Sequence, residues 1–324
     1  MLDTFCFFVY NVRVPKRVKQ ETQTQTQERH KDMFNYNQTN AKLHFARANK
    51  NGEFFIKMLH VVDEMPHYES HLNGKVVYIP NTKKTTEFAQ CDSFGRYFGS
   101  MSMLIKFGIK ELRYSYEDAL GNFVLITMNI DGSVSRTSIP VANEDEHMTQ
   151  VYKQIDKCDV VIGNPEGHKL RDMFTYIITL NKDYILSANV NFLNAKVCNI
   201  SYMTGRLKFG KTKPSKFFDV EKGKDVTFNS MWITSFDVNH APKMVNTFYD
   251  TQSYAYQKFD NLDAINVECI KMIPMNYKGV MGVPTSIIPL LNRSQFEVIA
   301  FKTVGATVDG KEMYAKALIR FRNI

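Results

Sequence analysis

The sequence has few cysteines and lacks the motifs that mark several large enzyme classes. Its five cysteines, among 324 residues, are far apart, form no Cys-x-x-Cys pair and have no histidine at zinc-ligand spacing. This pattern predicts a reduced chain without a structural metal. Gly-x-Ser-x-Gly, the phosphate-loop motif and the kinase motifs are absent too. The sequence therefore gives no support to serine hydrolase, nucleoside triphosphatase or kinase activity.

The chain also lacks a hydrophobic run that is long enough to cross a membrane. Its apolar start, residues 2–10, is short for a secretory signal, and no basic residue precedes it. We therefore expect no export and no membrane insertion, and a cytoplasmic location.

Charge and composition set the N-terminal 40 residues apart. The chain has 41 basic and 33 acidic residues, a surplus that suits a polyanionic partner and that a solvated basic surface explains equally well. Residues 14–40 are rich in Gln, Thr, Lys, Arg, Glu and Asn, with too few apolar groups to offset the chain entropy lost on folding. We predict a flexible basic arm over residues 1–40, which could follow a phosphate backbone or be a plain disordered leader.

Beyond the arm, helical and extended patterns alternate up to about residue 204, as in a wound α/β sheet. Residues 75–79 and 158–163 are predicted strands, residues 94–108 show helical spacing, and Asp131-Gly132 predicts a hairpin. Ligands of such sheets bind beyond the carboxyl ends of the strands. The loops that follow the two strands are therefore predicted to form the walls of one crevice.

A basic segment follows at residues 205–216, where lysine and arginine are mixed with glycine, serine and aromatic residues. Such a mixture is the best nucleic-acid-binding candidate in the chain, although an exposed loop with solvated lysines fits the same pattern. The predicted DNA-binding residues are Arg206, Lys208, Lys211, Lys213 and Lys216.

The strand at residues 158–163 ends in Asn164-Pro165. Amino-group methyltransferases use such a turn, because the Asn side chain and a backbone carbonyl accept hydrogen bonds from the exocyclic amine of an extruded base. Four other segments occur with it in a characteristic order: 54–56, 75–78, 259–265 and 279–284. On these segments the sequence resembles the EcoRI-type adenine-specific DNA methyltransferase family, over residues 41–322.

The resemblance implies a fold and an activity. It implies a Rossmann-like α/β sheet that binds S-adenosylmethionine, over residues 41–204, and a C-terminal α+β target-recognition region, over residues 205–324, packed on that core. It also implies double-stranded DNA as the partner and the exocyclic amine of adenine as the methyl acceptor.

The same resemblance assigns site residues, with no metal among them. The implied catalytic residues are Asn164, Pro165 and Glu166. The implied cofactor-binding residues are Glu53, Phe54, Phe55, Tyr78, Asn81 and Asp159.

Two departures from the family pattern leave an alternative open. The family turn continues with Pro and Phe, where this chain has Glu166-Gly167, and two family aspartates after the strand at 75–78 are replaced in the segment 81–84. The alternative is a catalytically inactive homologue, encoded for example by a phage and acting in the host cytoplasm. It would bind DNA through the basic segment or bind a restriction or defence protein.

Overall fold

The computed structural model describes most of the chain after residue 53. The described residues are 54–84, 93–165, 167–219, 223–238, 242, 244–247 and 256–322, without the side chains of 81–84 and 168. The predicted arm, Glu53 and Glu166 lie outside them.

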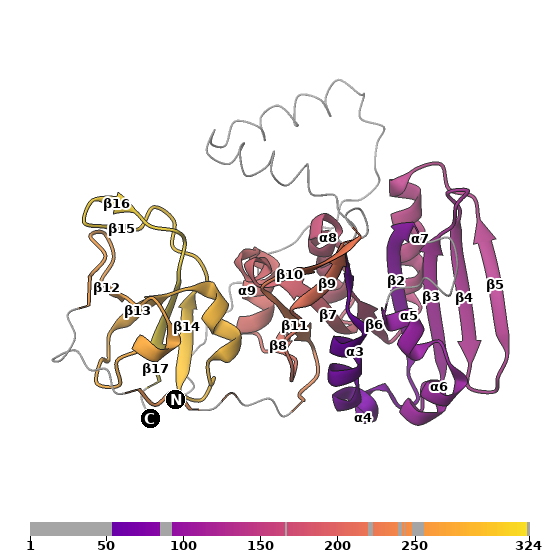
Figure 1. Ribbon diagram of the computed structural model, residues 1–324, viewed down its shortest axis with the longest axis horizontal. Coiled ribbons are helices and arrows are strands. Elements are labelled where there is room, and N and C mark those ends of the chain that lie inside the picture. The colour runs from indigo at the N-terminus through magenta and orange to yellow at the C-terminus, as the bar shows by residue number, and fades with distance from the viewer. Residues whose placement is uncertain are drawn as a thin grey trace, which may run out of the picture. The chain divides into compact units, whose positions relative to one another are not determined.

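An eight-stranded mixed sheet forms the centre of the described fold (Figure 1). Its order is β5-β4-β3-β2-β6-β7-β11-β8. The strands are β2 (Val76–Lys84), β3 (Glu111–Glu117), β4 (Phe123–Asn129), β5 (Val134–Ile139), β6 (Val160–Gly163), β7 (Asp183–Asn189), β8 (Lys208–Phe209) and β11 (Ser230–Thr234). The four strands β3, β2, β6 and β7 are parallel. Because β11 is antiparallel to both β7 and β8, β8 runs in the direction of β7.

Helices cover both faces of the parallel strands. Along β2, Val77 and Ile79 pack in one hydrophobic cluster and Tyr78 packs in another, as the alternation of side chains in a strand requires. The Tyr78 face carries α7 (Glu144–Asp156) and α8 (Gly167–Thr179). The other face carries α3 (Met58–Glu64), η1 (Met65–Tyr68), α4 (Glu69–Leu72), α5 (Ser93–Phe98) and α6 (Met101–Phe107). With both faces covered, β6 is buried at all four positions.

Three smaller sheets complete the described part of the chain. The first is antiparallel and joins β1 (Phe54–Ile56), β9 (Lys216–Asp219) and β10 (Lys224–Thr227). The second has the order β12-β13-β17-β14, with β12 (Ala264–Asn266), β13 (Val280–Val283), β14 (Phe296–Ala300) and β17 (Ala317–Phe321). The third pairs β15 (Thr307–Val308) with β16 (Lys311–Glu312). The remaining helices are η3 (Val190–Asn194), α9 (Lys196–Met203), η4 (Ile270–Met272) and η5 (Thr285–Leu290).

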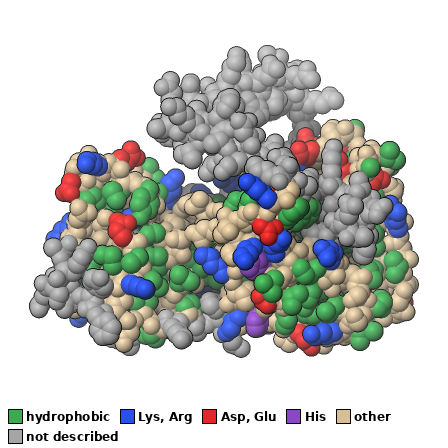
Figure 2. Space-filling model, in the orientation of Figure 1, with side chains coloured by type: hydrophobic (Ala, Val, Ile, Leu, Met, Phe, Trp, Pro, Cys, Tyr) green, Lys and Arg blue, Asp and Glu red, His purple; other side chains and the backbone are tan. Residues whose placement is uncertain are grey.

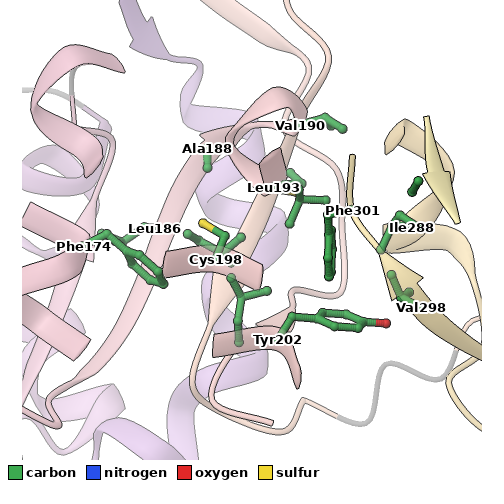
Figure 3. Close-up of a cluster of buried hydrophobic side chains, with 14 of the residues drawn as sticks. Phe174, Leu186, Ala188, Val190, Leu193, Cys198, Tyr202, Ile288, Val298 and Phe301 are labelled. Atoms are coloured by element: carbon green, nitrogen blue, oxygen red, sulfur yellow. The ribbon is translucent and has the colours of Figure 1, made fainter. Parts of the chain in front are cut away.

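The C-terminal sheet shares a hydrophobic cluster with the large sheet. Figure 3 shows side chains from β7, η3 and α9 meeting those of η5 and β14. At this junction the ring of Tyr202 meets that of Phe301 edge to face, with the centroids 5.1 Å apart. The guanidinium of Arg293 lies 3.8 Å from the centre of the Tyr202 ring and donates to the carbonyl of Leu207. The two parts of the fold are thus joined by apolar packing and by one arginine.

The observed elements confirm the predicted α/β class and refine it. The hairpin at Asp131-Gly132 is present as β4–β5, with Gly132 in the left-handed region at φ 91°. The helix predicted over residues 94–108 is two helices, because Ser100 has extended backbone angles. The large sheet takes β8 and β11 from beyond residue 204, so the predicted 204/205 boundary falls inside this sheet.

The described part of the chain lacks both a membrane-spanning helix and a cluster of metal ligands. No helix in the described part of the chain is both long enough and apolar enough to span a membrane. Among the same residues, no group of three His, Cys, Asp or Glu side chains is placed to hold a metal ion.

Candidate functional site

The order of the large sheet reverses between β2 and β6. The chain leaves β2 for β3, β4 and β5 on one side and returns through α7 to β6 on the other side of β2. Such a reversal opens a crevice at the carboxyl ends of the two central strands, where wound sheets bind their ligands. Here those ends are the residues from Pro80 onward and the turn Asn164-Pro165. They adjoin, since a Cβ on Gly163 would lie 3.6 Å from the carbonyl oxygen of Pro80.

The half-buried side chain of Asn164 is held in one orientation. Its Nδ2 donates a hydrogen bond of 2.9 Å to the backbone carbonyl of Phe54. Because a carbonyl can only accept, this contact identifies the amide nitrogen and turns Oδ1 away from Phe54. The side chain therefore presents an acceptor at the end of β6, which is the group that an exocyclic amine requires.

The segment that holds Asn164 is itself anchored by its neighbours. Backbone pairing places Phe54 opposite Asp219 of β9, and the ring of Phe54 meets Phe228 edge to face at 4.8 Å. On its other side, Ser93 donates to the carbonyl of Ile56. The structure thus brings Phe54, one of the predicted cofactor residues, to the predicted catalytic turn across 110 positions of sequence, and Phe55 follows it in β1.

Tyr78 and Asp159, two of the predicted cofactor residues, make other contacts within the sheet. Asp159 precedes β6, and its carboxylate accepts from the backbone N–H of Val76 at 2.8 Å, at the amino ends of the strands. Tyr78 is fully buried, its hydroxyl is 2.6 Å from Oγ of Ser115, and burial raises the pKa of its phenol. Both side chains fix strands and do not reach the crevice.

The remaining predicted positions near the turn are only partly described. Asn81 lies in the carboxyl-terminal half of β2, where the backbone alone is described. Pro165 is buried directly after Asn164. Glu53 and Glu166 adjoin described residues of the site but lie outside the described part.

The five basic residues predicted to bind DNA lie in two groups, one toward the amino ends of the parallel strands and one beyond their carboxyl ends. The guanidinium of Arg206 donates to the carbonyl of Lys182, just before β7, and Nζ of Lys208 donates to the carbonyl of Ser235, just after β11. Both contacts lie toward the amino ends of the parallel strands. Arg206 and Lys208 are therefore directed away from the crevice and stabilise backbone carbonyls.

The other three lie beyond the carboxyl end of β8. Lys211 and Lys213 are exposed in the turn between β8 and β9, and Lys216 is exposed at the start of β9. Figure 2 shows lysine and arginine side chains gathered over the middle of the visible face, where Figure 1 places β8 to β11. These three residues share the edge of the sheet that carries Asn164.

Sequence reasoning missed the residue that holds this turn. Glu64, fully buried at the end of α3, accepts hydrogen bonds from Tyr68 Oη (2.8 Å) and from the backbone N–H groups of Lys211 (2.9 Å) and Thr212 (2.6 Å). The hydroxyl of Thr212 donates to the same carboxylate at 2.6 Å. Gly210 is required beside it, because a Cβ there would lie 2.2 Å from Oε1 of Glu64. No sequence pattern connects positions that are 147 residues apart.

The chain is similar to a protein family and to several known proteins. Residues 198–322 match the family model described as "Adenine-specific methyltransferase EcoRI". The protein called Type II methyltransferase M.EcoRI, from Escherichia coli, is 27% identical over 327 residues, which cover 89% of this chain and 98% of the relative. These matches make the chain similar to the EcoRI-type methyltransferase family.

Two mycoplasma proteins are also similar to the chain. Type II methyltransferase M.MgeORF184P of Mycoplasma genitalium is 27% identical and covers 79% of this chain and 85% of its own length. Type II methyltransferase M.MpnI of Mycoplasma pneumoniae is 24% identical, with 78% and 83% covered. No solved structure matches the chain.

The C-terminal segments that carry the family resemblance meet in the structure. Strand β12 pairs in parallel with β13, and the ring of Phe259 fills the space in which a Cβ on Gly282 would lie, 2.5 Å from that position. The carboxylate of Asp260 accepts from the backbone N–H groups of Asp309 and Gly310 and so holds the β15–β16 turn. In this chain, the contacts of these segments are therefore structural.

Proposed function

We propose that this protein transfers a methyl group from S-adenosylmethionine to the exocyclic amine of adenine in double-stranded DNA. The observation that carries the proposal is the hydrogen bond from Asn164 Nδ2 to the carbonyl of Phe54, at the point where the strand order reverses. It leaves Asn164 Oδ1 as a directed acceptor beside the crevice. The names of the relatives, all Type II methyltransferases, support the same chemistry.

The role of Asn164 follows from this orientation. An adenine amine that donates to Oδ1 has its N–H bond polarised, and its nitrogen lone pair becomes more available for attack on an electrophilic methyl group. A backbone carbonyl of the turn can accept the second amine proton, so that the amine is held at two points. A bound donor would supply its methyl group to the amine nitrogen, with sulfur keeping the electron pair of the broken S–C bond, and the amine proton would pass to water. The fixed amide needs no reorganisation at this step.

The crevice residues fit a methyl donor of the S-adenosylmethionine type, which supplies the electrophilic methyl group when it is bound. The half-buried Phe54 and Phe55 and the carboxyl end of β2 border the crevice. Glu117, which sequence reasoning missed, ends β3, the strand next to β2. Wound nucleotide-binding sheets use an acidic residue at such a position to accept from ribose hydroxyls. Glu117 is therefore the carboxylate best placed for the donor, in place of the aspartates that the segment 81–84 lacks.

Double-stranded DNA would lie along the same edge. Lys211, Lys213 and Lys216 project there and can neutralise phosphates, whereas Arg206 and Lys208 cannot. In this proposal, the first three residues contribute to DNA affinity and the last two contribute to folding.

The test is transfer of label from a labelled donor to mixed-sequence duplex DNA. We expect label on adenine, and its loss in Asn164→Ala but not in Asn129→Ala, which removes an asparagine at the β4–β5 hairpin. Calorimetry with the donor alone measures binding, and Glu117→Gln is expected to weaken it. If the wild-type protein neither transfers label nor binds the donor, the proposal is wrong and the inactive homologue is the better description.

A further inference from the structure

A hollow opens at the edge of the sheet that carries Asn164, away from that residue. It lies at the carboxyl ends of β7 and β8 and the start of β11, and it has a volume of about 140 Å³. Neighbouring strands are roughly 4.8 Å apart, so the hollow, at β7, β11 and β8, is one to three strand spacings from β6, which carries the turn at Asn164. A DNA strand that reached Asn164 would pass over it.

The hollow has an apolar interior and a basic rim. Val190, Phe209, Met231 and Leu290 contribute to its lining, and Lys211 and Lys213 are exposed at its edge. Its volume is close to the roughly 150 Å³ that admits one benzene ring in an engineered apolar cavity. A ligand that matches both parts has one flat ring system and an adjoining negative charge.

The rim is rigid. Three hydrogen bonds to the buried Glu64, from Lys211 and Thr212, fix the turn that carries the lysines, and a fourth, from Tyr68, holds the carboxylate itself. The indole of Trp232, which also lines the hollow, donates to the hydroxyl of Thr212 at 3.2 Å. The apolar floor and the charged rim are thereby coupled through one hydrogen-bonded network.

We infer that this hollow is a subsite for one nucleotide of the bound DNA, separate from the adenine site at Asn164. The base enters the apolar interior, and Lys213, with Lys211, neutralises the adjoining phosphate. The inference rests on the proposed function in taking DNA as the partner. It adds a second point at which the protein holds the strand and a role for η5 of the C-terminal region, which supplies Leu290.

Trp232 makes the subsite observable, because it is the only tryptophan of the sequence. The wild-type protein is titrated with mixed-sequence duplex DNA and, separately, with heparin, a polyanion without bases, and tryptophan emission and affinity are measured. We expect both ligands to bind with salt-sensitive affinity, and only DNA to change the emission. Lys213→Glu is expected to weaken both ligands.

The variant Ser286→Phe fills the hollow from η5 and is matched by Ser138→Phe on the exposed strand β5. Stacking of one base contributes enough that Ser286→Phe is expected to lower DNA affinity about tenfold and to abolish the emission change, with heparin affinity kept. Leu290→Ala, a truncation of a side chain that is 49% exposed, tests the same point without filling the core. It is expected to weaken DNA and not heparin.

The outcomes separate the two proposals. If heparin changes the emission as DNA does, or if Ser286→Phe and Leu290→Ala bind DNA with wild-type affinity, the subsite is excluded while methyl transfer stands. If DNA is retained with the expected emission change but no label is transferred, the subsite stands and the proposed reaction fails. If the wild-type protein does not retain DNA, both fail.

Discussion

Replacing Glu64 with glutamine is expected to loosen the turn that presents Lys211 and Lys213. The carboxylate of Glu64 faces four donors, two at each oxygen. Glutamine keeps the shape but converts one oxygen into an NH₂ group, which then faces two donors. The tyrosine and threonine hydroxyls can rotate to other acceptors, whereas the backbone N–H of residue 211 or 212 cannot.

The expected magnitude follows from these contacts. Each hydrogen bond to a charged group contributes about 1.5–3 kcal/mol, and a buried donor that is left unpaired costs about 1–3 kcal/mol. With at least one backbone bond lost and the others weakened, Glu64→Gln should lower the free energy of unfolding by about 2–4 kcal/mol. Urea unfolding measures this, and Glu69→Gln, an exposed glutamate of α4, is the matched control.

DNA affinity distinguishes positioning from general destabilisation. In Glu64→Gln the slope of log affinity against log salt should fall by roughly 1–2, because each phosphate contact that is lost removes about 0.9. In a background of Lys211→Ala plus Lys213→Ala, the same change should have no further effect on DNA affinity. An equal loss in both backgrounds, or an unfolding free energy within about 0.5 kcal/mol of wild type, would refute the reasoning.

Three further outcomes are expected. Asn164→Asp sets a carboxylate against the carbonyl of Phe54, so methyl transfer should fall at least about 100-fold at neutral pH. Transfer should partly recover in acid, where a protonated carboxyl can donate to that carbonyl. A pH–rate profile without recovery contradicts this. Gly210→Ala places its Cβ 2.2 Å from a buried carboxylate oxygen and should destabilise the fold by about 1–3 kcal/mol in urea, whereas Gly167→Ala, in open space, should not. The ring of His60 accepts hydrogen bonds from two backbone N–H groups at the start of β9, and burial lowers its pKa. The contribution of His60 to stability should therefore be complete above the ordinary pKa of 6.5 and be lost as the pH falls below it. Urea midpoints that drop equally between pH 7 and 5 in wild type and His60→Gln would contradict this.

Local patterns predicted the centre of the fold because they depend on neighbours in sequence. The turn signal at Asp131-Gly132 lies between the two strands that it joins, and the apolar run of β6 is buried in the sheet. The position of Asn164-Pro165 at a strand end, and thus the location of the crevice, follows from the same run. These features need no knowledge of distant contacts.

The division of the basic segment could not be predicted in this way. Arg206 and Lys213 are seven positions apart in one segment of uniform composition, yet they lie at opposite edges of the sheet. The cause is β8, which is only two residues long and carries the chain from the amino ends of the parallel strands toward their carboxyl ends. The composition of the segment shows only how many charges it holds. The pairing of β8 with β11 decides at which ends of the strands each charge lies.

The segment from Phe54 to Tyr68 contacts both the turn at Asn164 and the turn that carries Lys211. The carbonyl of Phe54 orients Asn164, His60 accepts from the start of β9, and Glu64 holds the turn at Lys211 and Thr212. In the proposed function, one short segment thus orients both the amide that would act on the base and the lysines that would hold the DNA strand. Changes within it should therefore impair methyl transfer and DNA binding together. The contacts of Asp260, which hold the β15–β16 turn, reach neither group, so its replacement should affect folding without selecting between the two activities.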